Sequence, residues 1–192
     1  MRTHLDGFRG DTSETFIIGE PSKEARRLVD LARRCRDAGI AVIRDGARLG
    51  DIGFAIEQLA IREGCSVVRE FGGHGIGRKM HMAPHVSHFG KRGTGLLPRA
   101  GMVITVEPMI NLGGPEIRML SDGWTVLTVD GPMSAQLEHT VLVNQDGHQL
   151  LTLRARSDLE SGTDSLISPD PPDRLRAAAR RQLVPQNLCS NA

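Results

Sequence analysis

The chain has 192 residues, of which 24% are charged, and its formal net charge is +1 at pH 7. This length predicts one domain or a large part of one, and the near-neutral charge argues against a dedicated nucleic-acid or anionic-membrane surface. The sequence contains no run of about 18 apolar residues and its start has no apolar signal-peptide core. We therefore expect a cytoplasmic protein without a membrane or nucleic-acid partner.

The first element predicted along the chain is a β-hairpin in residues 1–18. Asp6-Gly7 is typical of the two-residue turn that joins antiparallel strands. With the turn at that place, the register puts Asp11 opposite Arg2. Asp11 is followed by Thr12 and Ser13, so a turn or helix-capping role is an alternative to a role as a ligand.

Two helices are expected next. Ser22 fits an N-cap, and apolar residues at helical spacing continue to near Gly39. A second helix begins at Asp51 and ends at Gly64, which can take the left-handed conformation. The first helix carries a basic stripe that is expected to face solvent, made of Arg26, Arg27, Arg33, Arg34 and Arg36.

Strands dominate from residue 66 onward. We predict strands at 66–71, 102–107, 124–129, 134–144 and 148–154. Alternation along two of them places Glu107 and Glu138 among polar residues on one face, while the opposite face is apolar. A buried, unpaired glutamate is costly, so these two positions indicate an inward cation site. The alternatives are an ion pair at the rim for Glu107 and a compensating arginine for Glu138.

After Arg154 the composition shifts to serine, aspartate and proline. We therefore divide the chain into a folded domain at 1–156 and a disordered tail at 157–192.

A glycine-rich loop carries the most informative histidine. Residues 72–81 read Gly-Gly-His-Gly-Ile-Gly-Arg-Lys-Met-His, and the glycines around His74 suit a tight backbone path beside an ion. His74 with Asp11, Glu107 and Glu138 would form a ligand set for a divalent cation of the Co, Mn, Fe or Zn type. Such a cation acidifies water and polarises a carbonyl, which is the chemistry of amide hydrolysis. The ordinary alternative for His74 is a solvent-facing loop residue.

These residues fall into ordered blocks that together resemble a known enzyme family. The blocks are Asp11, His74-Gly-Ile-Gly, His81, Glu107-Pro-Met, Asp122-Gly-Trp-Thr and Ser134-Ala-Gln-Leu-Glu-His-Thr. Their order resembles methionine aminopeptidase of the bacterial type over roughly residues 1–154. The resemblance implies the pita-bread α+β fold, a curved antiparallel sheet with helices on its outer face, in which two similar halves clasp a two-metal site.

The resemblance also implies roles for individual residues. Asp11, His74, Glu107 and Glu138 match metal ligands, and Glu107 would also shuttle a proton. His81 matches a histidine that donates a hydrogen bond to the scissile carbonyl oxygen. The family's first ligating aspartate would fall just before Met1, so we expect the first half of the fold to be largely missing and one cation to bind rather than two.

The substrate implied by the resemblance is a peptide or nascent protein that begins with methionine, and the ribosome is a partner by family analogy. Met80, Met109 and Trp124 match residues that line the methionine pocket, although ordinary core packing is the alternative for all three. His85 and His88 match no functional position and are expected to be exposed loop histidines.

Two other functions stay open. One is a non-catalytic or weakly active homologue that binds a single metal, a peptide or both. The other is a proline-specific peptidase of the same fold, which the Ser134 and His74 blocks disfavour.

Overall fold

The computed structural model describes residues 1–153, so the tail predicted at 157–192 lies outside the described residues. Within this part, the helices are α1 (Lys23–Ala41) and α2 (Leu49–Arg62). The strands are β1 (Arg2–Leu5), β2 (Phe8–Asp11), β3 (Ser66–Val67), β4 (Gly73–Gly75), β5 (Met82–Val86), β6 (Val103–Val106), β7 (Met109–Asn111), β8 (Ile117–Met119), β9 (Val126–Thr128), β10 (Ser134–Gln136), β11 (His139–Asn144) and β12 (Gly147–Leu150). None of the helices in residues 1–153 is long and apolar enough to cross a membrane.

Two antiparallel sheets form the centre of the domain. One has the order β12-β11-β6-β4-β5 and the other the order β10-β7-β3. They are joined end to end, because β6 continues into β7 and β10 continues into β11 after breaks of only two residues. The register is the same on both sides of the breaks, with His139 opposite Val106 and Gln136 opposite Met109. The two sheets therefore share one long antiparallel strand pair, β6–β7 with β10–β11, which is interrupted at its middle.

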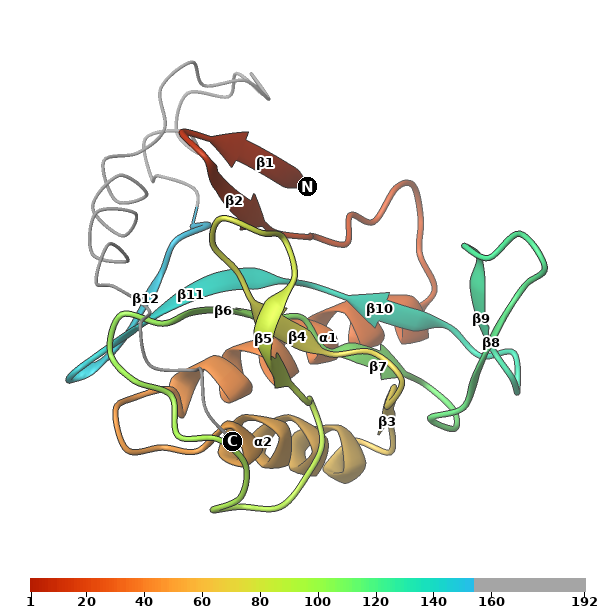
Figure 1. Ribbon diagram of the computed structural model, residues 1–192. Helices are drawn as coiled ribbons and strands as arrows, with labels where there is room; N and C mark the ends of the chain where they lie inside the picture. The colour runs from red at the N-terminus through yellow and green to blue at the C-terminus, as the bar shows by residue number, and fades with distance from the viewer. Residues whose placement is uncertain (154–192) are drawn as a thin grey trace.

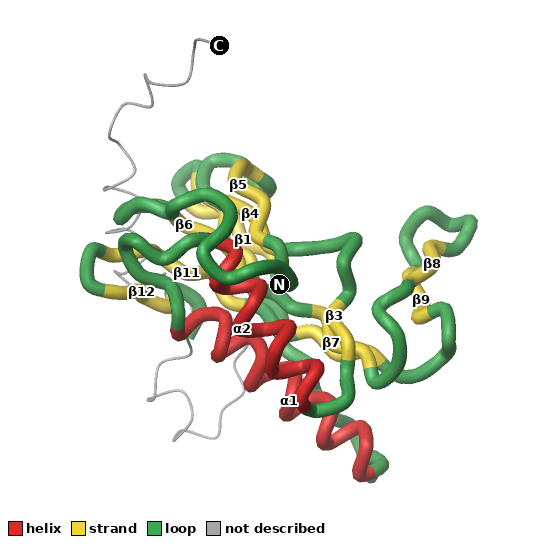
Figure 2. Tube along the Cα trace, turned by 90° about the horizontal axis from the view of Figure 1, so that it is seen from below, coloured by secondary structure: helices red, strands yellow, loops and turns green. Residues whose placement is uncertain are grey.

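The two helices cover one face of these sheets (Figures 1 and 2). The core between them contains Leu31, Ile56, Ile104 and Val141, each no more than 1% exposed. As predicted, the Ser22 side chain caps α1 by accepting a hydrogen bond from the backbone N–H of Ala25. Two buried cysteines, Cys35 and Cys65, have free thiols.

The basic stripe of α1 is only partly exposed, contrary to prediction. Arg36 is buried, with its guanidinium 2.9 Å from Asp37 Oδ1 and 3.8 Å from Glu14 Oε2. Glu14 lies in the segment that runs from the hairpin to the helix. This segment covers the end of the stripe, which the helical periodicity of α1 alone does not reveal.

The β1–β2 hairpin lies over the sheet face opposite the helices (Figure 1). Its turn is the one predicted, with positive φ angles of 50° at Asp6 and 82° at Gly7. The register is also confirmed, because Arg2 pairs with Asp11. The hairpin contacts the rest of the domain through an isolated bridge between Ser13 and Glu138 and a 2.7 Å hydrogen bond from Arg9 N to the Gly77 carbonyl.

Several predicted boundaries were wrong. The strand expected at 66–71 stops at Val67, and the helix expected from Asp51 begins at Leu49, with Asp51 accepting a hydrogen bond from Arg48 N. His74 lies on a strand, β4, rather than in a loop, because its neighbouring glycines allow close pairing with β5 and β6. A Cβ on Gly73 would lie 2.1 Å from the Thr105 carbonyl oxygen, so only glycine fits there.

A first prediction concerns the contact that anchors the 87–90 segment to α2. A Cβ on Gly53 would lie 2.3 Å from the carbonyl oxygen of Phe89. Alanine is favoured over glycine in a helix by about 1 kcal/mol, but a clash with backbone cannot be relieved by side-chain rotation. We expect Gly53→Ala to lower the free energy of unfolding by about 1–3 kcal/mol in urea denaturation.

The matched control is Ile61→Ala, because Ile61 lies on the same helix and is 57% exposed. This change is expected to alter stability by about 0.5 kcal/mol or less. An increase in stability for Gly53→Ala would contradict the close packing of α2 on the Phe89 backbone.

Candidate metal centre

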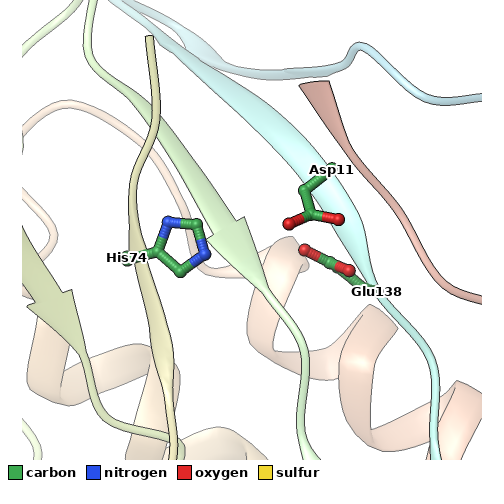
Figure 3. A group of neighbouring side chains, drawn as sticks. All are labelled: Asp11, His74 and Glu138. Carbon is green, nitrogen blue, oxygen red and sulfur yellow. The ribbon is translucent and has the colours of Figure 1, made fainter. Parts of the chain in front are cut away.

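The structure brings three of the predicted ligands together at one point. Asp11 ends β2, His74 lies in β4, and Glu138 lies between β10 and β11. One ligand atom from each of the three lies within 4.8 Å of the others. Figure 3 shows the two carboxylates side by side with the imidazole of His74 facing them across a short gap.

The fourth predicted ligand, Glu107, borders the same point. Its Oε1 lies 3.5 Å from His74 Nε2. Glu107 and Pro108 form the break between β6 and β7, and Leu137 and Glu138 form the break between β10 and β11. Because the register is unchanged across these breaks, Glu107 lies directly opposite Glu138. Like charges directly opposite each other on paired strands are destabilising, so a compensating charge is needed here.

Hydrogen bonds fix the Glu107 carboxylate and the backbone of Asp11. The Thr105 hydroxyl donates to Glu107 Oε1 at 2.9 Å, and the Gln136 amide donates to Glu107 Oε2 at 3.1 Å. Thr140 donates its hydroxyl proton to the Asp11 carbonyl at 2.6 Å and holds that end of the hairpin. The predicted polar face of Thr105, Gln136 and Thr140 is therefore the support of the ligand cluster.

Charge compensation within the described residues is weak. Asp11 and Glu138 are 5% and 4% exposed. Arg2 pairs with Asp11, its Nε 3.3 Å from Oδ2, but the Arg2 side chain is 61% exposed. Burial, followed by the charges of Glu107 and Asp11, raises the pKa of Glu138 to about 8. The charges of the N-terminal ammonium and of Arg2 only partly oppose this rise in the pKa of Glu138. Burial also raises the pKa of Glu107, against the lowering effect of the Thr105 hydrogen bond.

The donor set fits a divalent cation. Glu138 Oε1 is buried and has no hydrogen-bond partner among residues 1–153. Such an atom is rare in a folded protein and calls for a ligand. One imidazole and three carboxylates are the donors that cations of the Mn, Fe, Co and Zn type accept.

His81 lies beside the cluster, as its predicted role requires. Its ring centroid is 4.4 Å from that of His74, and the two ring planes are inclined by 73°. His81 is exposed, so its imidazole is accessible to a bound molecule. Its function as a hydrogen-bond donor to substrate stays a prediction.

The three residues expected to line a methionine pocket are placed differently from one another. Met80 precedes His81 and is half-buried, and Met109 begins β7 two residues after Glu107 and is also half-buried. Trp124 is 84% exposed in the turn between β8 and β9, a hairpin that projects to one side of the domain (Figure 1). The structure does not bring Trp124 to the cluster, and the pocket stays a prediction for all three.

His88 was predicted to be an exposed loop residue, and this was wrong. It is 2% exposed, and its Nε2 accepts a 3.1 Å hydrogen bond from the backbone N–H of Glu107. Burial lowers the pKa of His88 to about 3, so the ring stays neutral. A signal in the sequence was available: Met82, Pro84, Val86 and His88 alternate with more exposed residues, which is the period of a strand with one buried face. His85, by contrast, is exposed, although it lies in β5 rather than in a loop.

Comparison with known proteins agrees with this architecture. The sequence matches metallopeptidase family M24 over residues 1–145. A methionine aminopeptidase B of Synechocystis is 54% identical over 149 residues, which are 78% of this chain and 54% of the relative. The methionine aminopeptidase of Escherichia coli is 46% identical over 149 residues, covering 78% of this chain and 56% of the relative.

Solved structures give the same result. The crystal structure of methionine aminopeptidase from Rickettsia prowazekii superimposes with a TM-score of 0.77 at 46% identity, covering 78% of this chain and 60% of that one. A prolidase from Pyrococcus furiosus has a TM-score of 0.61 at 19% identity, which reflects a common fold.

The chain belongs to metallopeptidase family M24. Its fold is the pita-bread α+β fold expected from the sequence, with antiparallel sheets and helices on one face. The chain spans about half the length of the curated relatives it matches, 54% and 56% for the two named above.

The buried carboxylates predict a pH dependence of stability for the metal-free protein. The pKa of Glu138 rises from 4.5 to about 8 on folding, so between these values the folded state holds a proton that the unfolded state has lost. The free energy of unfolding therefore falls as pH rises through this window. His88 and His139, whose pKa values are lowered to about 3 and about 4, have the opposite effect below their ordinary value of 6.5.

The clearest window is thus pH 6.5 to 8. As pH rises through this window, we expect the free energy of unfolding of the metal-free wild type to fall by up to about 1.4 kcal/mol per pH unit. For Glu138→Gln the fall should be clearly smaller. Urea denaturation at several pH values, with a chelator present, measures both slopes. The control Glu70→Gln, at an exposed glutamate, should keep the wild-type slope. Equal slopes for wild type and Glu138→Gln would show that Glu138 is not protonated in the folded state.

Proposed function

We propose that this chain carries the catalytic centre of a metal-dependent aminopeptidase that removes N-terminal methionine from peptides and nascent proteins. The observation that carries the proposal is the cluster of Asp11, His74 and Glu138 with Glu107 at its border. The 46–54% identity to methionine aminopeptidases favours this specificity over that of the proline peptidases, which share the fold at 19% identity.

Asp11, His74, Glu107 and Glu138 would hold the divalent cation. When bound, the cation supplies Lewis acidity, which lowers the pKa of water and polarises a carbonyl group. The remaining contributions come from the side chains. The imidazole of His74 must be neutral to act as a ligand, and its Nδ1 lies 3.0 Å from the Gly75 carbonyl oxygen, a contact that favours the proton on Nδ1 and leaves Nε2 facing the carboxylates.

Glu107 is the proposed proton carrier. Its carboxylate is buried enough to raise the pKa, and it is oriented by Thr105 and Gln136. A carboxylate whose pKa is raised toward neutrality can accept a proton from the attacking water and return it to the leaving amine. The negative charge of the cluster also attracts the positively charged α-amine of a substrate. An aminopeptidase needs this contact, because it acts only at a free N-terminus.

His81 is the proposed hydrogen-bond donor that stabilises negative charge on the substrate carbonyl oxygen. It is exposed and its ring contacts that of His74, so a peptide group bound next to the cluster could receive its N–H as charge develops on the carbonyl oxygen. Met80, next to His81, and Met109, two residues after Glu107, are the proposed contacts of the methionine side chain, whereas the position of Trp124 in the projecting β8–β9 hairpin does not support such a contact. Action on nascent chains in the cytoplasm, near the ribosome, belongs to the same proposal.

Metal stoichiometry tests the ligand assignment. The four ligands in the described residues are enough for one tight site, so we expect about one divalent ion per chain after dialysis. His74→Ala is expected to remove it, whereas His85→Ala, at an exposed histidine on the neighbouring strand, should retain it. Elemental analysis of the dialysed proteins measures this. Two tight ions per chain would contradict the one-site assignment, and no ion in the wild type would favour a non-catalytic homologue.

Turnover of a Met-Ala-Ser peptide tests the role of His81. We expect His81→Ala to lower the turnover rate by about 10²- to 10³-fold, as the loss of one oxyanion donor does, while cobalt still binds. His85→Ala should leave turnover unchanged. Activity on Xaa-Pro peptides instead of Met-Ala-Ser would assign the chain to the proline-specific branch, and an unchanged rate in His81→Ala would remove that residue from the mechanism.

A further inference from the structure

One buried histidine has no part in the proposed chemistry. His88 is 2% exposed and lies two residues beyond the end of β5. Its Nε2 accepts the backbone N–H of Glu107 at 3.1 Å, so it contacts the main chain of a proposed ligand and not the ligand cluster itself.

This hydrogen bond satisfies a backbone N–H that has no partner strand beside it. On the side of β6 that faces β4, Val103 is paired through its carbonyl, which accepts from Ile76 N at 3.0 Å. Backbone groups of antiparallel strands point to alternate sides, so the N–H of Glu107 points to the same side as the carbonyl of Val103. The pairing recorded between β4 and β6 is at Gly75 and Ile104, and β4 begins at Gly73. The imidazole of His88 therefore provides the acceptor at the position where the strand pairing has ended.

The next residue in the chain cannot replace this hydrogen bond. The residue after Glu107 is Pro108, which has no N–H and cannot take part in the strand pairing as a donor. The backbone of Glu107, directly after β6, is therefore held by side chains: its N–H by His88 at 3.1 Å and its carbonyl by the longer 3.5 Å contact from Gln136 Nε2.

The segment that carries His88 is itself well anchored. The Phe89 backbone packs directly against Gly53 of α2, and Gly90 N donates to Glu57 Oε2 of the same helix at 3.2 Å. The Arg69 guanidinium stacks over the Phe89 ring at 5.1 Å. His88 consequently transmits the fixed position of α2 to the main chain of Glu107.

We propose that His88 is a positioning residue for Glu107: by accepting the Glu107 N–H it fixes the end of β6 and so aims the Glu107 carboxylate at the cation. This inference rests on the proposed function of Glu107. Partners outside the ligand set that orient a ligand commonly contribute about 10- to 100-fold to metal affinity. An acceptor at Nε2 requires the neutral ring with its proton on Nδ1, and burial keeps the ring neutral across the working pH range.

The test compares two replacements of similar length. His88→Gln keeps a side-chain oxygen that can accept from Glu107 N, whereas His88→Met fills the space without a comparable acceptor. We expect His88→Met to weaken Co²⁺ binding by about 10- to 100-fold and to change the visible absorption of the Co²⁺ complex, and His88→Gln to restore most of both. His85→Gln, at the exposed histidine of β5, is the control.

The outcomes distinguish failure of the proposed metal site from failure of the positioning role of His88. If the wild type binds Co²⁺ no better than Glu107→Ala, the proposed function fails, and with it the role of His88. If the wild type binds tightly, Glu107→Ala does not, and both His88 variants match the wild type, only the positioning role is overturned. Equal losses in His88→Gln and His88→Met, in proportion to lost thermal stability, would likewise reduce His88 to a packing residue.

One measurement needs no variant, in case His88→Met does not fold. The nitrogen chemical shifts of the His88 ring in the wild-type protein report which nitrogen carries the proton. We expect Nδ1 to be protonated and Nε2 to be an unprotonated acceptor from pH 5 to 8. A proton on Nε2 would exclude the hydrogen bond from Glu107 N and overturn the inference.

Discussion

The constraint on which the rest of this structure depends is the convergence of three carboxylates in a nearly buried place. Glu107 and Glu138 lie opposite each other on paired strands, and Asp11 reaches the same point from a hairpin. The nearby cations among residues 1–153 are Arg2 and the N-terminal ammonium of Met1. Both belong to largely exposed residues, and solvent screening makes such pairs weak. Repulsion among the carboxylates therefore destabilises the folded protein without a cation. The same charges favour binding of a cation, which neutralises them.

The sheet tolerates this constraint because its two faces are used differently. The face toward the helices is apolar and buries residues such as Ile104 and Val141 against α1 and α2, which supplies the stability. The other face carries Thr105 and Gln136, which hold the Glu107 carboxylate by hydrogen bonds, and Thr140, which holds the backbone of Asp11. Interruption of both strands at the glutamates frees these two residues from regular pairing. Stability and site geometry thus come from opposite sides of the same two strands.

The sequence predicts the local features well and the tertiary ones poorly. The Asp6-Gly7 turn, the Ser22 cap and the shared face of Glu107 and Thr105 follow from residue type and period alone, and the structure has all three. The burial of Arg36 was missed because it depends on the segment of Glu14, which folds back over the helix. The burial of His88 was missed although residues 82–88 alternate with the period of a strand, and the partner of its ring, Glu107 N, is distant along the chain. His74 was expected in a loop since its glycines suggest one, whereas close approach of neighbouring strands is what those glycines permit.

The least secure ligand is the one brought by the hairpin. The strands β1 and β2 have four residues each, and the side chains of β1 are exposed, so the hairpin gains little from burial. It is held by backbone contacts around Glu138, where Glu138 N donates to the Ser13 carbonyl at 2.9 Å and Thr12 Oγ1 donates to the Glu138 carbonyl at 2.9 Å. Asp11 and Glu138 are thus positioned by the same docking contact. A cation that binds both carboxylates necessarily stabilises that contact, because binding to one conformation shifts the equilibrium toward it. Metal affinity and docking of the hairpin are for this reason a single coupled equilibrium in this chain.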